Sequence, residues 1–415
     1  MVVARQFQNG ALAWFDPRGR EIAIFAYATS FYWLPQAMLA FVPQLANALG
    51  RSRASRRVCL KFTVGASAVL TLPMILAGFT PAGKQLLGRA LGIAEPAVLE
   101  QVAAYLRWLA PMIVFNGVRH YYTGLLVQAR RTGVVAALNV THVPLVAIAL
   151  AAGLLLKWSA VPTILLAQIV PLGLQMIAAW VLFRAFYREP LEPEEEQLTL
   201  AKTAHFFWPV ALTGLMFAFT RPIIYSFVNR VASEDPKPVI AALRVGFDLA
   251  VLFQMASNQF RHVFVTFGSR HLPGLRKFMR RVVFVVTALM LVVALTPLKT
   301  LFFGRVLGLD SPVREYAGHV LLAMCAVPTI IAWRNYYHGL AMIHRRTVGM
   351  GIGGVARNSA AFALSWAFLA AGWLGHPAVA AGVLVCAFTA EASAVILATW
   401  SWRRRLPAEL RHDVN

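Results

Sequence analysis

The chain has 415 residues, of which 59% are hydrophobic and 13% are charged, and its mean hydropathy is +0.63. Soluble globular domains carry about 25% charged residues, so this composition excludes a soluble domain and indicates a polytopic membrane protein. The net charge of +22 does not indicate nucleic-acid binding, because the basic residues interrupt apolar runs instead of gathering on one face.

The first twenty residues lack the basic region, apolar core and cleavage site of a signal peptide, so no removable presequence is expected. The apolar runs that follow are long enough for a bilayer, which requires about 20 helical residues. The predicted spans are 22–49, 58–79, 97–128, 133–156, 159–183, 205–229, 239–268, 282–301, 316–343, 348–373 and an eleventh at about 377–402.

Residues 188–202, "REPLEPEEEQLTLAK", form a long polar connection without an apolar face. We interpret this segment as a solvated acidic linker between an N-terminal bundle, 1–187, and a C-terminal bundle, 203–415. Lys and Arg concentrate in alternate connections between the spans, and cytoplasmic loops collect these residues. The linker and the C-terminus are therefore expected on the cytoplasmic side.

Several segments occur twice at nearly one spacing. "RHYYTGLLVQARRT" at 119–132 recurs as "RNYYHGLAMIHRRT" at 334–347, "LLGRALGI" at 86–93 as "FFGRVLGL" at 302–309, and "ALAAG" at 149–153 as "FLAAG" at 368–372. A repeat unit with an even number of spans returns to its starting side, so the halves must be parallel. The sequence thus predicts an all-α fold of two parallel-repeat helical bundles, with a cavity between them that opens to either side in turn.

The two halves differ in their number of full spans. The C-terminal half has six and the N-terminal half has five, while the repeat offset aligns Arg5 with Arg221. We therefore expect 11 full transmembrane helices and a truncated first helix.

Three arginines are expected at membrane depth. Arg119 and Arg334 each lie 11 residues before a double arginine, which corresponds to about 16 Å of helix, or the middle of a ~30 Å hydrocarbon core. Arg357 reaches a similar depth from its own end of a span. An unpaired charge there costs about 2.5–3.5 kcal/mol, so these side chains must face protein or water.

Two acids lie at comparable depth. Glu391 is 12 residues before Arg403, and Asp248 is four residues after Arg244, with which it is expected to pair. A purely structural set of internal ion pairs is one interpretation of these charges. The alternative is a cavity of positive potential that binds anions, because arginines outnumber acids and two of them recur in the repeat.

Each repeated arginine has a tyrosine three residues later, Tyr122 after Arg119 and Tyr337 after Arg334. Each pair shares one helix face, and the planar guanidinium suits phosphate or carboxylate. Substrate contact and helix packing both remain open for the tyrosines. We predict neither a cofactor nor a metal, because the cysteines and histidines show no ligand spacing, and a membrane enzyme would require clustered Asp, Glu or His.

Several motifs resemble the progressive ankylosis protein family. They include "FFWPVAL" at 206–212, "RPIIYSFVNR" at 221–230, "RVGFDLAVLFQMASNQFRHVFVTF" at 244–267 and "WRNYYHGLAMIHRRT" at 333–347. The resemblance implies a MATE-like fold within the superfamily of multidrug extruders and lipid-linked saccharide flippases, and export of ATP, pyrophosphate precursors or citrate. It also matches charged family positions with Arg221, Arg261, Arg334, Arg357 and Glu391, whereas Arg119 is supported by the repeat alone.

The functional prediction is a monomeric transporter that exports small organic or phosphorylated anions by alternating access. Its predicted substrate ligands are Arg119, Tyr122, Arg334, Tyr337, Arg357, Arg221 and Arg261. Glu391 and Asp248 are predicted to couple transport to a proton or another cation. The alternatives are a flippase for pyrophosphate-linked lipid saccharides, a multidrug extruder and a non-transporting scaffold. The richness in alanine and arginine is typical of a bacterial chain, which would place it in the cytoplasmic (inner) membrane.

Overall fold

The computed structural model describes residues 2–187, 198–231, 235–343 and 348–403, so most of the acidic segment expected to be a linker, 188–197, lies outside the described residues. All regular structure within these ranges is helical. The chain divides into two compact units, which we call unit 1 and unit 2. Unit 1 contains Val3–Asp16 and Ile24–Pro222, and unit 2 contains Pro17–Ala23 and the chain from Ile223 onward.

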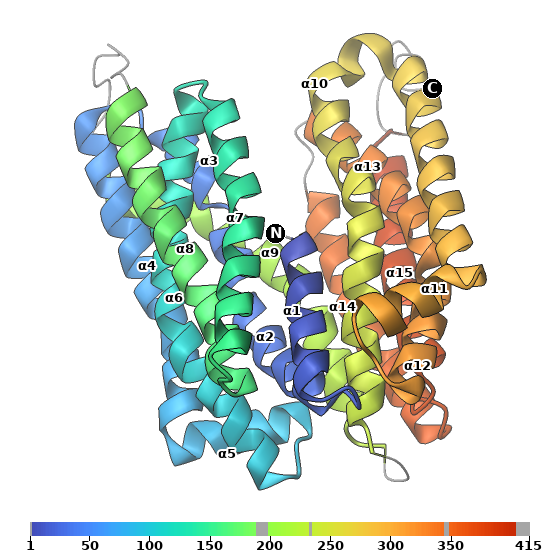
Figure 1. Ribbon diagram of the computed structural model, residues 1–415. Coiled ribbons are helices and arrows are strands. Elements are labelled where there is room, and N and C mark those ends of the chain that lie inside the picture. The colour runs from blue at the N-terminus through green and yellow to red at the C-terminus, as the bar shows by residue number, and fades with distance from the viewer. Residues whose placement is uncertain (1, 188–197, 232–234, 344–347, 404–415) are drawn as a thin grey trace. The chain divides into compact units, whose positions relative to one another are not determined.

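Unit 1 contains helices α1 to α8, apart from Val2 and the first residues of α2, and most of α9, and most of these helices are separated by short turns (Figure 1). They are α1 (Val2–Phe15), α2 (Arg20–Leu39), α3 (Val42–Leu49), α4 (Arg53–Phe79), α5 (Pro81–Leu91), α6 (Pro96–Gln128), α7 (Thr132–Leu155), α8 (Ala160–Phe186) and α9 (Leu200–Val228), whose end belongs to unit 2. Side-chain caps define two of the helix starts. Ser52 Oγ accepts from the Ser55 amide at 3.1 Å and begins α4, while Thr80 Oγ1 accepts from the Gly83 amide at 3.0 Å and begins α5.

Unit 2 is built around one long helix. Its helices are α10 (Lys237–Leu295), α11 (Leu298–Thr300), the π-helical η1 (Leu301–Val306), α12 (Ser311–Ala323), the 3₁₀ turn η2 (Met324–Ala326), α13 (Val327–Ile343), α14 (Val348–Ala370) and α15 (Pro377–Arg403). The expected spans 239–268 and 282–301 are therefore joined through α10, without a loop between them.

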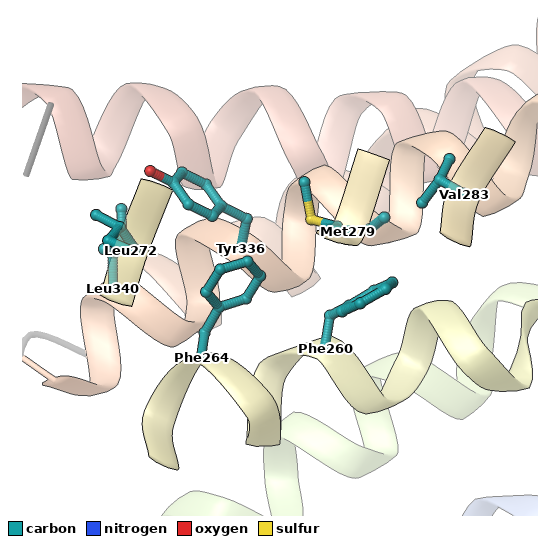
Figure 2. Close-up of a cluster of buried hydrophobic side chains, with 8 residues drawn as sticks. Phe260, Phe264, Leu272, Met279, Val283, Tyr336 and Leu340 are labelled. Carbon is teal, nitrogen blue, oxygen red and sulfur yellow. The ribbon is translucent and has the colours of Figure 1, made fainter. Parts of the chain in front are cut away.

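Helix α10 folds back on itself. The rings of Phe260 and Phe278 lie 6.1 Å apart, whereas 18 residues of straight helix would separate them by about 27 Å. Figure 1 shows the bend in the yellow ribbon of α10. A buried apolar cluster fills the angle between its two arms, and α13 supplies Tyr336 and Leu340 to the same cluster (Figure 2).

Nine helical segments of the described residues are long and apolar enough to cross a membrane. The chain is therefore a polytopic all-α membrane protein, and the number of 11 full crossings stays a prediction. One pair of helix starts also follows the sequence repeat. Helices α8 and α15 begin at Ala160 and Pro377, which correspond at nearly the same offset.

Candidate functional site

Unit 1 contains a buried arginine bound by neutral groups. Arg119 on α6 is 5% exposed, and its Nη1 donates to Oε1 of Gln175 on α8 at 2.9 Å. Its Nε donates to Oδ1 of Asn116, one turn earlier, at 3.0 Å. Gln175 is itself fixed by α7, because its Nε2 donates to the Leu138 carbonyl at 2.5 Å. Within the described residues, no carboxylate lies in ion-pair range of Arg119.

The network around Arg119 continues into α2. Asn116 Nδ2 donates to Oε1 of Gln36, and Gln36 Nε2 donates to the Tyr32 hydroxyl at 2.9 Å. Gln36 and Tyr32 are both buried. Four helices of unit 1, α2, α6, α7 and α8, therefore converge on one guanidinium through amide and hydroxyl groups. These contacts orient Arg119 without neutralising its charge.

Unit 2 contains a charged arrangement of similar design. Glu391 on α15 accepts hydrogen bonds at a single oxygen, Oε2, from Nη1 of Arg334 at 3.1 Å and from Nη1 of Arg357 at 2.8 Å. Arg334 lies on α13 and Arg357 on α14. All three side chains are buried, and Arg357 is 1% exposed. The ion pairs therefore tie three helices together inside unit 2.

Close helix packing makes these ion pairs possible. A Cβ at Gly353, one turn before Arg357, would lie 2.6 Å from Cγ2 of Val395 and 3.3 Å from both Cγ and the carbonyl oxygen of Glu391. Only glycine allows α14 to approach α15 this closely. On the other side, Asn335 accepts from Nη2 of Arg334 at 3.2 Å and donates to the Ser257 carbonyl of α10 at 2.8 Å.

The two arrangements correspond through the internal repeat. The repeated segments that begin at Arg119 and Arg334 align these two arginines, and almost the same offset aligns Gln175 with Glu391. The pairing of "ALAAG" with "FLAAG" aligns Leu138 with Arg357. In unit 1 the arginine meets an amide that is held by a backbone carbonyl, whereas in unit 2 it meets a carboxylate that is held by a second arginine.

The two predicted tyrosine ligands lie among apolar side chains. Tyr122 packs on a cluster that includes Leu126 and Ala179, and its ring lies 5.3 Å from that of Phe183. Tyr337 packs on the cluster of Figure 2, with its ring 5.1 Å from Tyr336. Neither phenol hydrogen-bonds to the arginine three residues before it in the described structure. Helix packing accounts for both positions, and their role as substrate ligands stays a prediction.

The remaining predicted site residues, Arg261, Asp248 and Arg221, lie at three different places in the fold. Arg261 lies half-buried on α10 and interacts electrostatically with Arg334, so it belongs with the unit 2 cluster. Asp248 and Arg244 are both buried one turn apart on the first arm of α10. Arg221 lies half-buried on α9. The structure thus brings Arg261, Arg334, Arg357 and Glu391 together.

Several polar residues of these networks were not among the sequence predictions. They are Gln36, Asn116 and Gln175 in unit 1 and Asn335 in unit 2. Gln175 had a usable signal, because the repeat aligns it with Glu391 and makes it the neutral counterpart of a charge at membrane depth. No group of three or more metal-ligating side chains occurs in the part of the chain that the structure describes.

No protein-family model matches the chain, and no curated protein matches its sequence. Solved structures of membrane transporters share its fold. An inward-facing multidrug resistance MATE family transporter of the MOP superfamily aligns with 97% of this chain and 94% of its own, at a TM-score of 0.68 and 12% identity. The lipid II flippase MurJ, in an inward closed conformation, aligns with 95% of this chain and 84% of its own, at a TM-score of 0.64 and 13% identity.

A mutant of the Vibrio cholerae MATE transporter VcmN aligns with 97% of this chain and 96% of its own, at a TM-score of 0.60 and 14% identity. Identity this low supports a shared fold and nothing finer. The chain is therefore a polytopic membrane protein with the fold of the MATE transporters and of MurJ.

Proposed function

We propose that the protein is a membrane transporter that exports small organic or phosphorylated anions by alternating access. The observation that carries the proposal is the imbalance of buried charge. Among the described residues, the buried charged side chains comprise two acids, Asp248 and Glu391, and five arginines, Arg56, Arg119, Arg244, Arg334 and Arg357. The fold that the chain shares with transporters supports the transport part of the proposal.

The chemistry of arginine supports an anionic substrate. A guanidinium at membrane depth is retained at a cost of about 2.5–3.5 kcal/mol unless it meets a compensating group. Arg119 meets only amide oxygens in the described structure, so its charge attracts an anion. Its planar fork of donors matches the oxygens of phosphate or carboxylate.

The resemblance to the progressive ankylosis family supports a finer proposal. Citrate, nucleotides and pyrophosphate are the proposed substrates. The proposed ligands remain Arg119, Tyr122, Arg334, Tyr337, Arg357, Arg221 and Arg261, with Glu391 and Asp248 in coupling to a proton or another cation. A MOP superfamily transporter from Pyrococcus furiosus, with a TM-score of 0.57 and 13% identity, is described as having a binding pocket of reverse polarity that suggests a different function.

A second candidate function is favoured by the match to MurJ, which is a lipid II flippase. A flippase for pyrophosphate-linked lipid saccharides would also require buried cationic groups. A multidrug extruder for cations fits less well, because cationic substrates require buried carboxylates, and the buried charged side chains in the described part of unit 1 are Arg56 and Arg119.

Transport by purified protein in proteoliposomes tests the proposal. Labelled citrate, ATP and pyrophosphate are offered separately, and efflux is compared with that from protein-free liposomes. We expect flux of at least one of these anions, reduced at least tenfold by Arg119→Gln. The matched control is Arg57→Gln, which removes an exposed arginine of the same unit. Movement of a lipid-linked saccharide or a cationic dye, without flux of any of the three anions, would overturn the proposal.

A further inference from the structure

Unit 2 holds a second set of buried polar groups beside the ion pairs of Glu391. Ser257 and Gln254 on α10 are 0% and 3% exposed, and His338 on α13 is 5% exposed. Within the described residues, Oγ of Ser257, Nε2 of Gln254, both ring nitrogens of His338 and Nε of Arg261 have no hydrogen-bond partner. Buried polar groups are nearly always paired, so this many unpaired polar atoms in one region require an explanation.

These groups lie close to the paired arginines. Positions 254, 257 and 261 share one face of α10, and His338 is one turn after Arg334 on α13. Asn335 bonds the Ser257 carbonyl, and a Cβ at Gly339 would lie 3.7 Å from the Arg261 carbonyl oxygen, so this face of α10 abuts α13. His338 also interacts electrostatically with Arg334, Arg357, Arg261 and Glu391.

We propose that the hydroxyl, amide, imidazole and guanidinium N–H and O–H groups of these side chains form one oxyanion-binding site inside unit 2 together with Arg334 and Arg357, and that the Glu391 carboxylate competes with the bound oxyanion for both guanidiniums. The ligand class is a phosphate or carboxylate group of the substrate. The inference rests on the proposed function and deepens it. It adds three substrate ligands, Gln254, Ser257 and His338. It also makes Glu391 a side chain that competes with the substrate for Arg334 and Arg357.

The hydrogen bonds of Glu391 are the evidence that its carboxylate competes with an oxyanion. Both arginines donate to the same oxygen, Oε2, which is how two guanidiniums hold one oxygen of an oxyanion. Unit 1 provides the reference state without a competitor, because the Gln175 amide accepts the equivalent hydrogen bond at 2.9 Å and leaves the charge of Arg119 in place. Glu391→Gln would reproduce that neutral contact in unit 2.

Binding of inorganic pyrophosphate to the purified full chain in detergent, measured by calorimetry, tests the site. We expect Glu391→Gln to lower the Kd about tenfold. Glu391→Asp, which keeps the charge but shortens the side chain, should lower it about threefold and provides the test if the glutamine variant does not fold. Ser257→Ala and Gln254→Leu should each raise the Kd about fivefold.

The matched control is Ser365→Ala. Ser365 is also buried with an unpaired Oγ, but it lies eight residues, or about 12 Å, beyond Arg357 along α14. We expect the Kd of the Ser365→Ala variant for pyrophosphate to stay within twofold of the wild-type value. Unchanged Kd values in the Glu391 variants, or equal effects at Ser257 and Ser365, would overturn the inference alone. Failure of the wild-type chain to bind or transport pyrophosphate, citrate or ATP would overturn the proposed function with it.

Discussion

Gln175 and Glu391 take equivalent places in the two units. Each accepts a hydrogen bond from Nη1 of one of the two arginines that the internal repeat aligns with each other. The donor is Arg119 at 2.9 Å in unit 1 and Arg334 at 3.1 Å in unit 2. The partners are 56 and 57 residues apart in the sequence. Duplication has therefore kept the contact and changed its charge, so that one arginine is left cationic and the other is paired.

The first prediction concerns a substitution that gives Arg119 the kind of carboxylate partner that Arg334 has in unit 2. Gln175→Glu would place a carboxylate on Arg119 and neutralise it, so we expect anion flux in proteoliposomes to fall at least tenfold. The control, Gln168→Glu, adds the same charge two turns earlier on α8, where the native side chain bonds Gln8. A similar loss of flux in both variants would show that added negative charge, and not the pairing of Arg119, is responsible.

The second prediction concerns the stability of the ion-pair cluster. Arg357→Ala would leave Glu391 with one fewer partner in a buried position, and breaking a buried pair typically costs about 3–5 kcal/mol. We expect a lower thermal unfolding midpoint for the variant purified in detergent. Glu391→Gln should recover part of the loss when it is combined with Arg357→Ala, because the uncompensated charge is then removed. Purely additive losses would contradict the assignment.

Features that depend on local pattern could be predicted from the sequence. Apolar runs located most membrane helices, and repeated motifs such as those at 119–132 and 334–347 disclosed the duplication. The continuity of α10 was not predicted. The segment "SRHLPGLRKFMRR" interrupts the hydropathy and so predicts two spans on either side of it, and two candidate spans, Lys237–Arg261 and Leu272–Leu295, do lie there. The backbone between them nevertheless stays helical through the bend, although the segment contains Pro273.

The composition of the site was harder to predict than its location. Buried charges are conspicuous in an apolar chain, so Arg119, Arg334 and Glu391 could be selected from the sequence. Which of these charges pair with each other could not, because the contact of Arg357 with Glu391 joins two helices across 34 residues and depends on how those helices pack. Gln175 carries no charge and therefore did not stand out, although an amide at membrane depth also requires hydrogen-bond partners.

The third prediction tests the orientation deduced from the loop charges. Fusions at the C-terminus should be cytoplasmic, so green fluorescent protein should fluoresce there and alkaline phosphatase should be inactive. A phosphatase fusion at Lys157, between α7 and α8, should be active, because that connection is predicted on the opposite side. The reverse pattern at the two positions would show that the predicted orientation is wrong.

The fourth prediction uses two glycines of α14 as a matched pair. Gly353→Ala would force a Cβ to within 2.6 Å of Val395 and 3.3 Å of Glu391, so α14 must move away from α15 and the contact between Arg357 and Glu391 must lengthen. Overpacking of this kind costs about 1–3 kcal/mol. Gly351→Ala meets nothing within 4 Å and should raise stability by about 0.5–1 kcal/mol through helix propensity. Thermal unfolding of both variants in detergent measures the difference, and equal midpoints would show that the close approach at Gly353 does not hold the ion pairs in place.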